Sequence, residues 1–550
     1  MISMRYLRLR LVLVPFIVLS APAVLFAQDR NQVARSTSGM VVTAHPLATY
    51  AGQRILDAGG NAADAAVAAA FAVAVVRPSM NSIGGRNQIL IRLPNGEVHG
   101  IDGTTQVPEG YDATTAPRAA YGYATIGVPG ALAGLMRLHG EHGSLPLDVL
   151  MAPAIDYAEN GFRLLSGQAR FHQGAAKPIA ESEGASAVYL KDDGAPYGVG
   201  ELLRQAELAH TYRKIIEGGA DTFYRGEIAE AMANDIQSHG GFLSKQSLAN
   251  YEAVDARIVR GNYRGYDLVA MDLPASGAIA IQALHIMENF DRDEFSAAEW
   301  ATITAQAIAL AIPELMRAGT DTGAVRATSK EWAAQQAERV KLTVVATGGG
   351  LDAPSPWSHE GYTTHISVAD RDGMVVSLTQ TIGPAMGSKV ATPGLGFLYA
   401  VTLGGYLGGD QSPGARARSG ITPLLVLKDG EPVLVLGAAG GLRIISAVVQ
   451  VATRFIDDEM TLAEASAAPR INPDFGRDFT FSGLAMETTP GRGWTPEQVE
   501  AVRAMGFDVT ETPRPGAFGR VQAIRYDRET GTWVGVSDPG SEGSAGGAGN

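Results

Sequence analysis

The run GYTTHISVADRDGMVVSLTQT, residues 361–381, is the part of this sequence that decides its fold. Its β-branched residues favour pleated strands and its Asp-Gly pair is typical of a turn, so the run predicts two strands joined by a turn. A peptide cut before Thr363 would also place a free α-amino group beside the threonine hydroxyl, giving a nucleophile and a proton acceptor in one residue. A threonine pair in a strand is usually structural, so both interpretations stay open on this run alone.

Composition predicts a globular protein and excludes several function classes. The 550 residues are 46% hydrophobic, enough for one large core or two to three modest ones. With 44 Lys+Arg against 57 Asp+Glu, the net charge of −13 makes nucleic acid an unlikely partner class. The absence of cysteine excludes disulfides, thiol catalysis and thiolate metal sites. The 10 histidines show no His-Glu-x-x-His spacing, so we expect neither a metal nor another cofactor.

The N-terminal residues have the order of charge, apolar stretch and small residue that is typical of a secretory signal. Three arginines lie among the first ten residues, and the apolar stretch 11–26 ends before Ala27. We predict a signal peptide over residues 1–27. The alternative is a membrane anchor, but the stretch contains two prolines and is shorter than the ~20 residues of a spanning helix. We therefore expect a periplasmic or secreted protein without a stable membrane anchor.

Strands are predicted towards both ends of the chain, with helices between them. This order favours a layered α/β domain assembled from the beginning and the end of the sequence. The predicted strands outside the opening run are 39–44, 88–93, 424–427 and 432–436, and the predicted helices are 61–73, 130–139, 147–160, 206–217, 227–239, 296–317, 444–455 and 461–468.

Two segments are predicted to lack regular structure. Residues 346–360 are polar and rich in Gly, Pro and Ser, so they read as an exposed loop directly before Thr363. Such a loop gives a cleavage site an accessible approach. Residues 541–550 are mostly Gly, Ser and Ala, and we predict a disordered tail.

An ordered set of motifs from about residue 39 to residue 539 resembles the γ-glutamyltransferases, or glutathione hydrolases, which are N-terminal-nucleophile hydrolases. The resemblance implies a four-layer αββα sandwich, an α/β fold. It also implies a precursor that cuts itself between Tyr362 and Thr363 into a large chain, 28–362, and a small chain, 363–550, which stay packed as one composite domain. The motifs are GMV at 39–41, HPLA at 45–48, GGNAADAAVA at 59–68, VPG at 128–130, DTFYRG at 221–226, YRGY at 263–266 and LGAAGGLRI at 436–444.

The same resemblance implies a catalytic set. Thr363 would attack an amide carbonyl and form an acyl-enzyme, while its α-amino group, with an ordinary pKa of ~7.7–8, accepts and returns the proton. The Thr381 hydroxyl would hold the nucleophile in place. The backbone amides of Gly440 and Gly441 would form an oxyanion hole, in which one donor contributes about 3–4 kcal/mol. These glycines also fit an ordinary strand-to-helix turn, and both interpretations can hold together.

The substrate pocket departs from the family pattern at several positions. Thr104 stands where an arginine usually grips the α-carboxylate of a γ-glutamyl group, and Gly383 replaces an asparagine. Ser419-Gly420 replaces a serine pair, and Gly404-Gly405 replaces an acidic pair that binds the α-ammonium group. The contacts to a glutamyl head group are therefore lost or weakened.

At Arg86 the sequence gains a charged group instead of losing one. It lies in the first Gly-rich loop, where the family usually has smaller or apolar residues. Our hypothesis is that its guanidinium binds a carboxylate or carbonyl of a different substrate. The alternative is an ordinary surface arginine.

These observations predict a threonine-nucleophile amide hydrolase that acts on a small-molecule amide, with a non-glutamyl or modified acyl group. The leading alternative is a true γ-glutamyltransferase or glutathione hydrolase. A further alternative is a homologue that is not cut and serves as a binding module.

Overall fold

The computed structural model describes residues 31–313, 329–344, 362–406, 410–475, 481–513 and 517–549. The predicted signal peptide and the predicted loop 346–360 lie outside these residues. None of the helices within the described ranges is long and apolar enough to cross a membrane.

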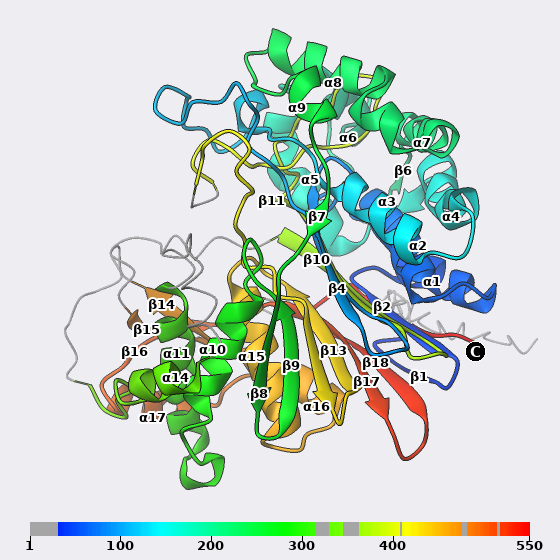
Figure 1. Cartoon of the computed structure of the whole chain (residues 1–550). Coiled ribbons are helices and arrows are strands. Elements are labelled where there is room, and N and C mark those ends of the chain that lie inside the picture. The colour runs from blue at the N-terminus through cyan, green and yellow to red at the C-terminus, as the bar shows by residue number, and fades with distance from the viewer. Residues whose placement is uncertain are drawn as a thin grey trace, which may run out of the picture. The chain divides into compact units, whose positions relative to one another are not determined.

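Two seven-stranded sheets form the centre of the fold (Figure 1). In the first sheet the order is β1 (Val33–Ser36), β18 (Thr532–Ser537), β17 (Arg520–Asp527), β13 (Glu431–Ala439), β12 (Leu424–Lys428), β9 (Tyr266–Met271) and β8 (Ile258–Tyr263). In the second sheet it is β19 (Ser544–Gly547), β2 (Gly39–Thr43), β10 (Tyr362–Asp370), β11 (Val375–Gly383), β3 (Arg86–Arg92), β4 (Val98–Gly103) and β7 (Val254–Asp255).

An apolar core lies between the two sheets and joins them face to face. Met40, Val42 and Leu90 of the second sheet pack with Leu425 and Val435 of the first, and all five are fully buried. Strands of both sheets therefore bury one face against the other sheet, as in a sandwich.

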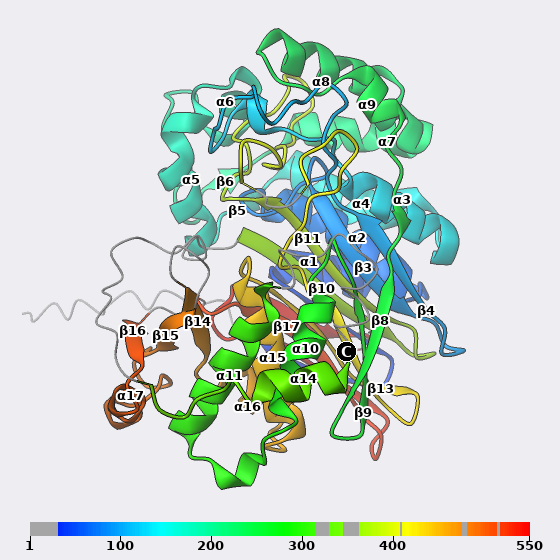
Figure 2. The ribbon, with the colours of Figure 1, turned by 60° about the vertical axis from the view of Figure 1, so that its left-hand side comes forward.

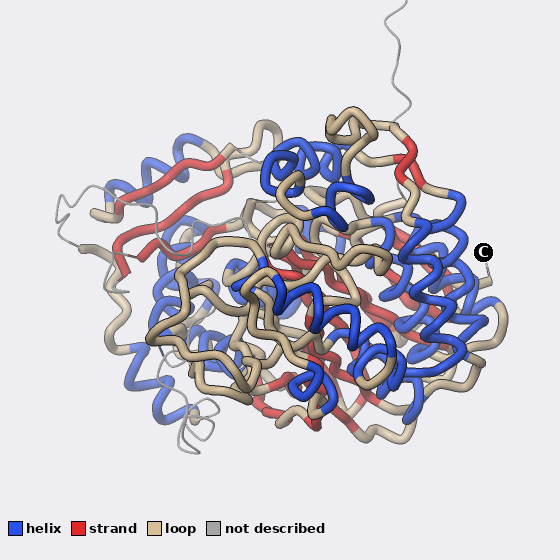
Figure 3. The backbone as a smooth tube through the Cα atoms, turned by 90° about the horizontal axis from the view of Figure 1, so that it is seen from above, coloured by secondary structure: helices blue, strands red, loops and turns tan. Residues whose placement is uncertain are grey.

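Helices cover the outer faces of both sheets, which completes the predicted αββα order (Figures 1 and 2). Loops lie over the ends of the strands in the view from above (Figure 3). The second sheet carries α1 (Pro46–Asp57), α2 (Ala62–Val76), α3 (Ala131–His142), α4 (Leu147–Asn160), α5 (Ser166–Ile179), α6 (Glu183–Tyr189), α7 (Ala206–Tyr224), α8 (Glu227–Ser238) and α9 (Lys245–Ala249) on its side of the sandwich. The first sheet carries α10 (Gly277–Met287), α11 (Ala297–Ala311), α14 (Lys330–Ala337), α15 (Arg443–Ile456) and α16 (Leu462–Ala467).

Smaller elements surround the sandwich. A three-stranded sheet of β14 (Ile471–Phe475), β15 (Phe481–Glu487) and β16 (Asp508–Thr512) packs with α17 (Pro496–Ala504) and α11 around a separate apolar cluster. The short strands β5 (Phe162–Arg163) and β6 (Leu202–Leu203) form a pair of their own.

Helix α2 shows how the sequence dictates the packing beneath the second sheet. All of its residues are buried, and nine of the fifteen in AADAAVAAAFAVAVV are alanine, which lets neighbouring elements approach closely. Its N-terminus is fixed by a capping box between Asn61 and Asp64.

The predicted strand pair in residues 361–381 is confirmed as β10 and β11, adjacent antiparallel strands in the middle of the second sheet. The predicted disordered tail is wrong. Ser544–Gly547 forms β19, which pairs with β2 from Ser544 opposite Thr43 to Gly547 opposite Met40. The small residues permit this approach, because a Cβ on Gly546 would lie only 2.8 Å from Gln53 Oε1.

Candidate active site

Thr363 lies at the start of β10, with 4% of its surface exposed. Its hydroxyl donates to the Thr381 hydroxyl of β11 at 3.3 Å. The register between the two strands is irregular here, since Tyr362 lies opposite Gly383 and Thr364 lies opposite Gln380. This bulge in β11 orients Thr381 towards Thr363, and bulges are common beside active sites.

Thr381 also contacts the peptide bond that precedes Thr363. Its hydroxyl donates to the Tyr362 carbonyl oxygen at 2.5 Å and accepts from the Gly383 amide at 3.0 Å. A single hydroxyl therefore touches the predicted nucleophile and the carbonyl of the predicted cleavage site. This arrangement can polarise that carbonyl next to a hydroxyl able to attack it.

The side chain of Tyr362 is packed against α5. Its ring meets Phe171 edge to face, with ring centroids 5.1 Å apart. Burial raises its pKa, while Arg520, Arg170 and Arg443 act in the opposite direction. Three arginines therefore lie near enough to Tyr362 to favour its ionised form.

Beyond Thr363 a polar cluster fills the space between the sheets. His365 is fully buried, and its Nδ1 is 2.7 Å from the Thr379 hydroxyl, while its Nε2 lies 3.2 Å from Ser367 Oγ and 3.3 Å from Ser377 Oγ. Ser377 in turn donates to the carbonyl of Leu436 in the first sheet at 3.0 Å. Burial lowers the pKa of His365 to about 3, so its imidazole is neutral at physiological pH.

The polar cluster also shows which way β13 runs. Ser377 lies opposite Ser367 and contacts Leu436, whereas the next residue, Gly437, lies against His365, where a Cβ would be 2.3 Å from the ring. Strand β13 therefore runs towards the Thr363 end of β10. Its continuation brings Gly440 and Gly441 to that end.

Gly440 and Gly441 form the turn between β13 and α15. Their φ angles are 153° and 62°, which favour glycine. A Cβ on Gly440 would lie 3.0 Å from the Cα of Gly519. The hydrogen bonds that close the turn use the carbonyl oxygens of both glycines, which accept from Arg443 and Ile444 at 3.2 Å. Such a turn before a helix can direct amide N–H groups at an anion.

Arg86 begins β3, directly opposite Thr381 in the register between β3 and β11. The surface-arginine alternative is wrong, because only 2% of Arg86 is exposed. Its Nη1 donates to the Val401 carbonyl at 3.3 Å and to the Thr105 hydroxyl at 3.5 Å. Burial lowers the pKa of Arg86, and the neighbouring Tyr406 raises it.

Two other predicted substrate residues, Thr104 and Gly383, are in close contact with their neighbours. Thr104 is fully buried, and its hydroxyl donates to the Ala417 carbonyl at 3.2 Å, so this hydroxyl is committed to the fold. Gly383 has a φ of 88°, and a Cβ there would lie 3.0 Å from the ring of Tyr406. Sequence reasoning did not single out Tyr406, although an aromatic residue directly after a Gly-Gly pair was a usable signal.

Ser419 and Gly420 lie beside the glycine turn. A Cβ on Gly420 would be 2.6 Å from the carbonyl oxygen of Gly441. The backbone of Ser419 is fixed by Pro274 and Ser276, at 3.0 and 2.7 Å. Its hydroxyl oxygen is buried and has no hydrogen-bond partner among the described residues.

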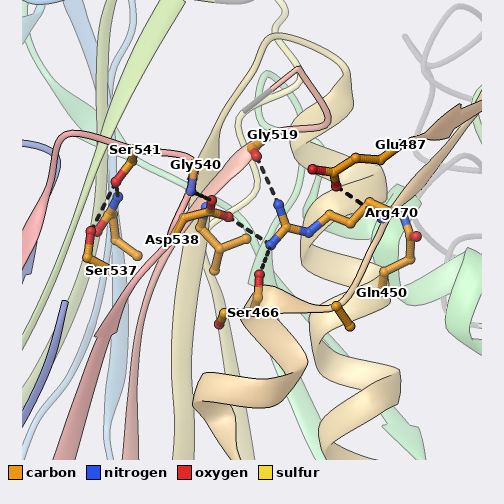
Figure 4. Close-up of polar contacts among 12 residues, drawn as sticks. Gln450, Ser466, Arg470, Glu487, Gly519, Ser537, Asp538, Gly540 and Ser541 are labelled. Atoms are coloured by element: carbon orange, nitrogen blue, oxygen red, sulfur yellow. Dashed lines mark hydrogen bonds and ion pairs between the residues drawn. The ribbon is translucent and has the colours of Figure 1, made fainter. Parts of the chain in front are cut away.

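Sequence reasoning missed a buried ion pair that contacts Gly519 (Figure 4). Arg470 Nη2 lies 2.7 Å from Asp538 Oδ2, with 3% and 1% of the two side chains exposed. Arg470 Nη1 donates to the carbonyl of Gly519 at 3.0 Å, and Gly519 is the residue that packs on Gly440. No sequence spacing links Arg470 to Asp538, so no signal could have found the pair.

Metal-ligating side chains do not gather in this region. Within the described ranges, no group of three His, Cys, Asp or Glu residues is placed to hold a metal ion.

Comparison with known proteins identifies the family. The γ-glutamyltranspeptidase family model matches residues 48–548. The chain belongs to the γ-glutamyltranspeptidase family. It is an enzyme of the hydrolase and transpeptidase type, as its relatives are.

Relatives of this family member include glutathione hydrolases and acylases. It is 31% identical to the glutathione hydrolase proenzyme of Escherichia coli K12, over 94% of this chain and 92% of the relative. It is 32% identical to the acylase ACY 1 proenzyme of Pseudomonas sp. strain SE83, over 92% of both chains.

A solved structure confirms the fold class. The cephalosporin acylase from Bacillus halodurans superimposes with a TM-score of 0.85 at 27% identity, covering 97% of this chain and 100% of that one. The γ-glutamyltranspeptidase family member described here therefore has the αββα sandwich of the N-terminal-nucleophile hydrolases.

Proposed function

We propose that this protein is a precursor that cuts itself between Tyr362 and Thr363 and then hydrolyses small-molecule amides through an acyl-enzyme on Thr363. The observation that carries the proposal is the Thr381 hydroxyl, which contacts both Thr363 Oγ1 and the Tyr362 carbonyl oxygen. The proenzyme names of its relatives support a processed precursor. In this proposal residues 1–27 are removed on export to the periplasm or medium, and chains 28–362 and 363–550 stay associated.

The cutting step uses the Thr363 hydroxyl and the Tyr362 carbonyl, both of which contact the Thr381 hydroxyl. Thr363 Oγ1 attacks the Tyr362 carbonyl carbon, the C–N bond breaks, and the hydroxyl proton goes to the released nitrogen. The resulting ester joins Tyr362 to the Thr363 side chain. Water then hydrolyses the ester, leaving a carboxylate on Tyr362 and a free α-amino group on Thr363.

Turnover repeats this chemistry on a substrate. The free α-amino group of Thr363 takes the hydroxyl proton as Oγ1 attacks the amide carbonyl, and it returns that proton to the departing amine. The Gly440 and Gly441 amides would stabilise the oxyanion, and Thr381 would orient the nucleophile. Water releases the acyl group and restores Thr363.

The acyl group we propose is not γ-glutamyl. The Thr104 hydroxyl donates a hydrogen bond to the Ala417 carbonyl. Gly383 and Gly404-Gly405 have no side chains with which to hold the head group of an α-amino acid. True glutathione hydrolysis remains the second candidate, because the glutathione hydrolase and acylase relatives are almost equally similar, at 31% and 32% identity.

Self-cleavage is tested on the purified protein with a denaturing gel and N-terminal sequencing. We expect two fragments that comigrate under native conditions, the smaller beginning at Thr363. The Thr363→Ala variant should stay intact, whereas Thr363→Ser should still be cut. A wild-type chain that remains whole after long incubation would favour the binding-module alternative.

Substrate class is tested with the cut enzyme and a panel of anilides. The proposal expects hydrolysis of at least one non-glutamyl anilide at a higher kcat/KM than the γ-glutamyl anilide. Preference for the γ-glutamyl anilide would instead support glutathione hydrolysis.

A further inference from the structure

The two adjacent threonines at the start of β10 face opposite sides of the second sheet. Side chains alternate along a strand, so Thr363 shares a face with His365, which lies against Gly437 of the first sheet. Thr364 shares the other face with Ile366, which packs in the core beneath the helices. Thr364 is fully buried there, and the proposed reaction makes no use of its hydroxyl.

The Thr364 hydroxyl is the middle member of a hydrogen-bonded chain. It donates to the Gln380 carbonyl at 2.9 Å and accepts from Asn81 Nδ2 at 2.9 Å. All three residues are fully buried. Because the hydroxyl uses its single proton on the carbonyl, its other neighbour must be a donor, which fixes the orientation of the Asn81 amide.

This chain ends at the bulge in β11, which begins directly after Gln380. Between the pair Thr364–Gln380 and the next pair along the ladder, β10 has one residue and β11 has two, Thr381 and Ile382. A bulge disrupts the hydrogen bonds of the ladder and re-aims side chains. The Thr364 hydroxyl therefore binds the last carbonyl before the bulge, on the face opposite to the contact between Thr363 and Thr381.

The loop that carries Asn81 also binds the bulge itself. The amide of Ile382 donates to the Met80 carbonyl at 3.3 Å. The loop, residues 77–85 between α2 and β3, is buried throughout, and Arg77 Nη2 lies 3.0 Å from Met80 Sδ. Two consecutive residues of one buried loop thus hold both strands at the bulge, one through its side chain and one through its backbone.

We propose that Asn81 and Thr364 are positioning residues for the cut before Thr363, which act through the bulge and do not touch the reacting atoms. This inference rests on the proposed function, since it assumes that Thr363 attacks the Tyr362 carbonyl. The Thr381 hydroxyl contacts both of these groups, so its position depends on the bulge. A displacement of about 1 Å can cost about 100-fold in rate, so bonds on the reverse face can govern the cut.

The test measures the rate of self-cleavage of freshly synthesised full chain on a denaturing gel. We expect Thr364→Val, which removes the hydroxyl and keeps the shape, to slow the cut by about 10- to 100-fold. Thr364→Ser keeps the hydroxyl and should retain most of the wild-type rate. Asn81→Leu should also slow the cut. The double variant Asn81→Leu with Thr364→Val should be no slower than Thr364→Val, because both changes break one hydrogen-bonded chain.

Thr211→Val is the matched control. Thr211 of α7 is fully buried, and its hydroxyl donates to the Leu395 carbonyl at 2.9 Å, so the same kind of bond is lost from the same kind of environment. Urea unfolding in the uncut Thr363→Ala background compares the stability of the two valine variants. We expect similar losses of stability but a slow cut in Thr364→Val alone. Equal slowing of both variants would show a general effect of stability and would overturn the inference.

The outcomes separate this inference from the proposed function. A wild-type chain that is not cut would overturn the proposed function and this inference with it, whereas a Thr364→Val chain cut at the wild-type rate would overturn the inference alone. Hydroxylamine, which cleaves esters, should not restore the rate of Thr364→Val, because the slow step is the attack by Thr363; restoration would refute the inference. If Thr364→Val does not fold, Asn81→Leu decides, since a wild-type rate in that variant would also refute it.

Discussion

The Thr381 hydroxyl uses its full hydrogen-bonding capacity at the candidate site. It donates to the Tyr362 carbonyl and accepts from Thr363 Oγ1 and from the Gly383 amide. A hydroxyl has one proton to donate and two lone pairs, so no freedom remains for it to rotate. Its position in the uncut chain is therefore fixed.

Replacing this hydroxyl by a methyl group is the sharpest single test of the cutting step. We expect Thr381→Val to slow self-cleavage by about 100-fold or more, the usual effect of removing one aligned donor. Thr381→Ser should stay within about tenfold of wild type. The measurement is the fraction of uncut chain against time on a denaturing gel. Cleavage of the valine variant at the wild-type rate would contradict this role.

The buried, neutral His365 should lower the free energy of unfolding in acid. Burial lowers its pKa to about 3, against an ordinary value of about 6.5, so between these values the unfolded chain binds a proton that the folded chain does not. The contribution of His365 to stability therefore falls as the pH decreases from about 6.5, by up to about 1.4 kcal/mol per pH unit. The measurement is urea unfolding at pH 7, 6 and 5.

Other histidines contribute to the same pH dependence, so the test compares the wild type with a His365 variant. Burial lowers the pKa of His172 to about 4, so it contributes to the same acid loss. We expect His365→Asn to lower stability at pH 7 and to reduce the acid-dependent loss by about one proton, leaving the contributions of the other histidines whose pKa burial lowers, His142, His172 and His285. Identical slopes in the wild type and in this variant would show that His365 is not buried as a neutral group.

At the scale of elements, the turn between β13 and α15 depends on groups distant in the sequence. Gly440 packs on Gly519, and the carbonyl of Gly519 is held by Arg470, which is paired with Asp538. The Asp538 carboxylate also accepts from the amides of Gly540 and Val521, at 2.7 and 3.2 Å. The candidate oxyanion turn thus packs against one buried ionic network.

Removing one partner of the Arg470–Asp538 pair should destabilise the fold. We expect Arg470→Met to lower the free energy of unfolding by about 3–5 kcal/mol, because Asp538 would remain as a buried, unpaired charge. The double variant Arg470→Met with Asp538→Leu should recover part of that loss. Denaturant unfolding of the single and double variants measures both values. A single variant within about 1 kcal/mol of wild type would argue against a buried charge pair.

The elements that could be predicted carry their signal locally. The β-branched residues and the Asp-Gly turn of residues 361–381 indicate β10 and β11, and the alanine run of α2 indicates close burial. The tail could not be predicted, because β19 exists only through its pairing with β2, about 500 residues away in the chain. Thr363 and Thr381 stand out through motif order, whereas the burial of Arg86 depends on segments that approach it from elsewhere.

At the scale of the whole molecule, the predicted cut separates strands that alternate within each sheet. In the second sheet, β2 and β3 flank β10 and β11. β2 and β3 precede Thr363 in the chain, whereas β11 and all of β10 except Tyr362 belong to the part that begins at Thr363. In the first sheet, β1 and the pair β8 and β9 flank four strands from the C-terminal part. Neither part contains a complete seven-stranded sheet.

The tail strand gives a test of this interleaving. Deleting residues 544–550 removes the outer partner of β2 and exposes its backbone. We expect the melting temperature to fall by about 2–5 °C, and the two chains of the cut protein to separate at a lower urea concentration. Calorimetry and size-exclusion chromatography measure the two effects. Deletion of Asn550 alone is the control, and an unchanged melting temperature for the longer deletion would contradict the expectation.

In the proposed scheme, the contact of Thr381 with the Tyr362 carbonyl makes cleavage depend on correct folding. The hydroxyl reaches that carbonyl only when β10 and β11 are paired in their final register, so a misfolded chain would keep its peptide bond intact. The free α-amino group, and with it amide hydrolysis, then arises only in molecules whose β10 and β11 are correctly paired. A cell would therefore be spared an active but misassembled hydrolase.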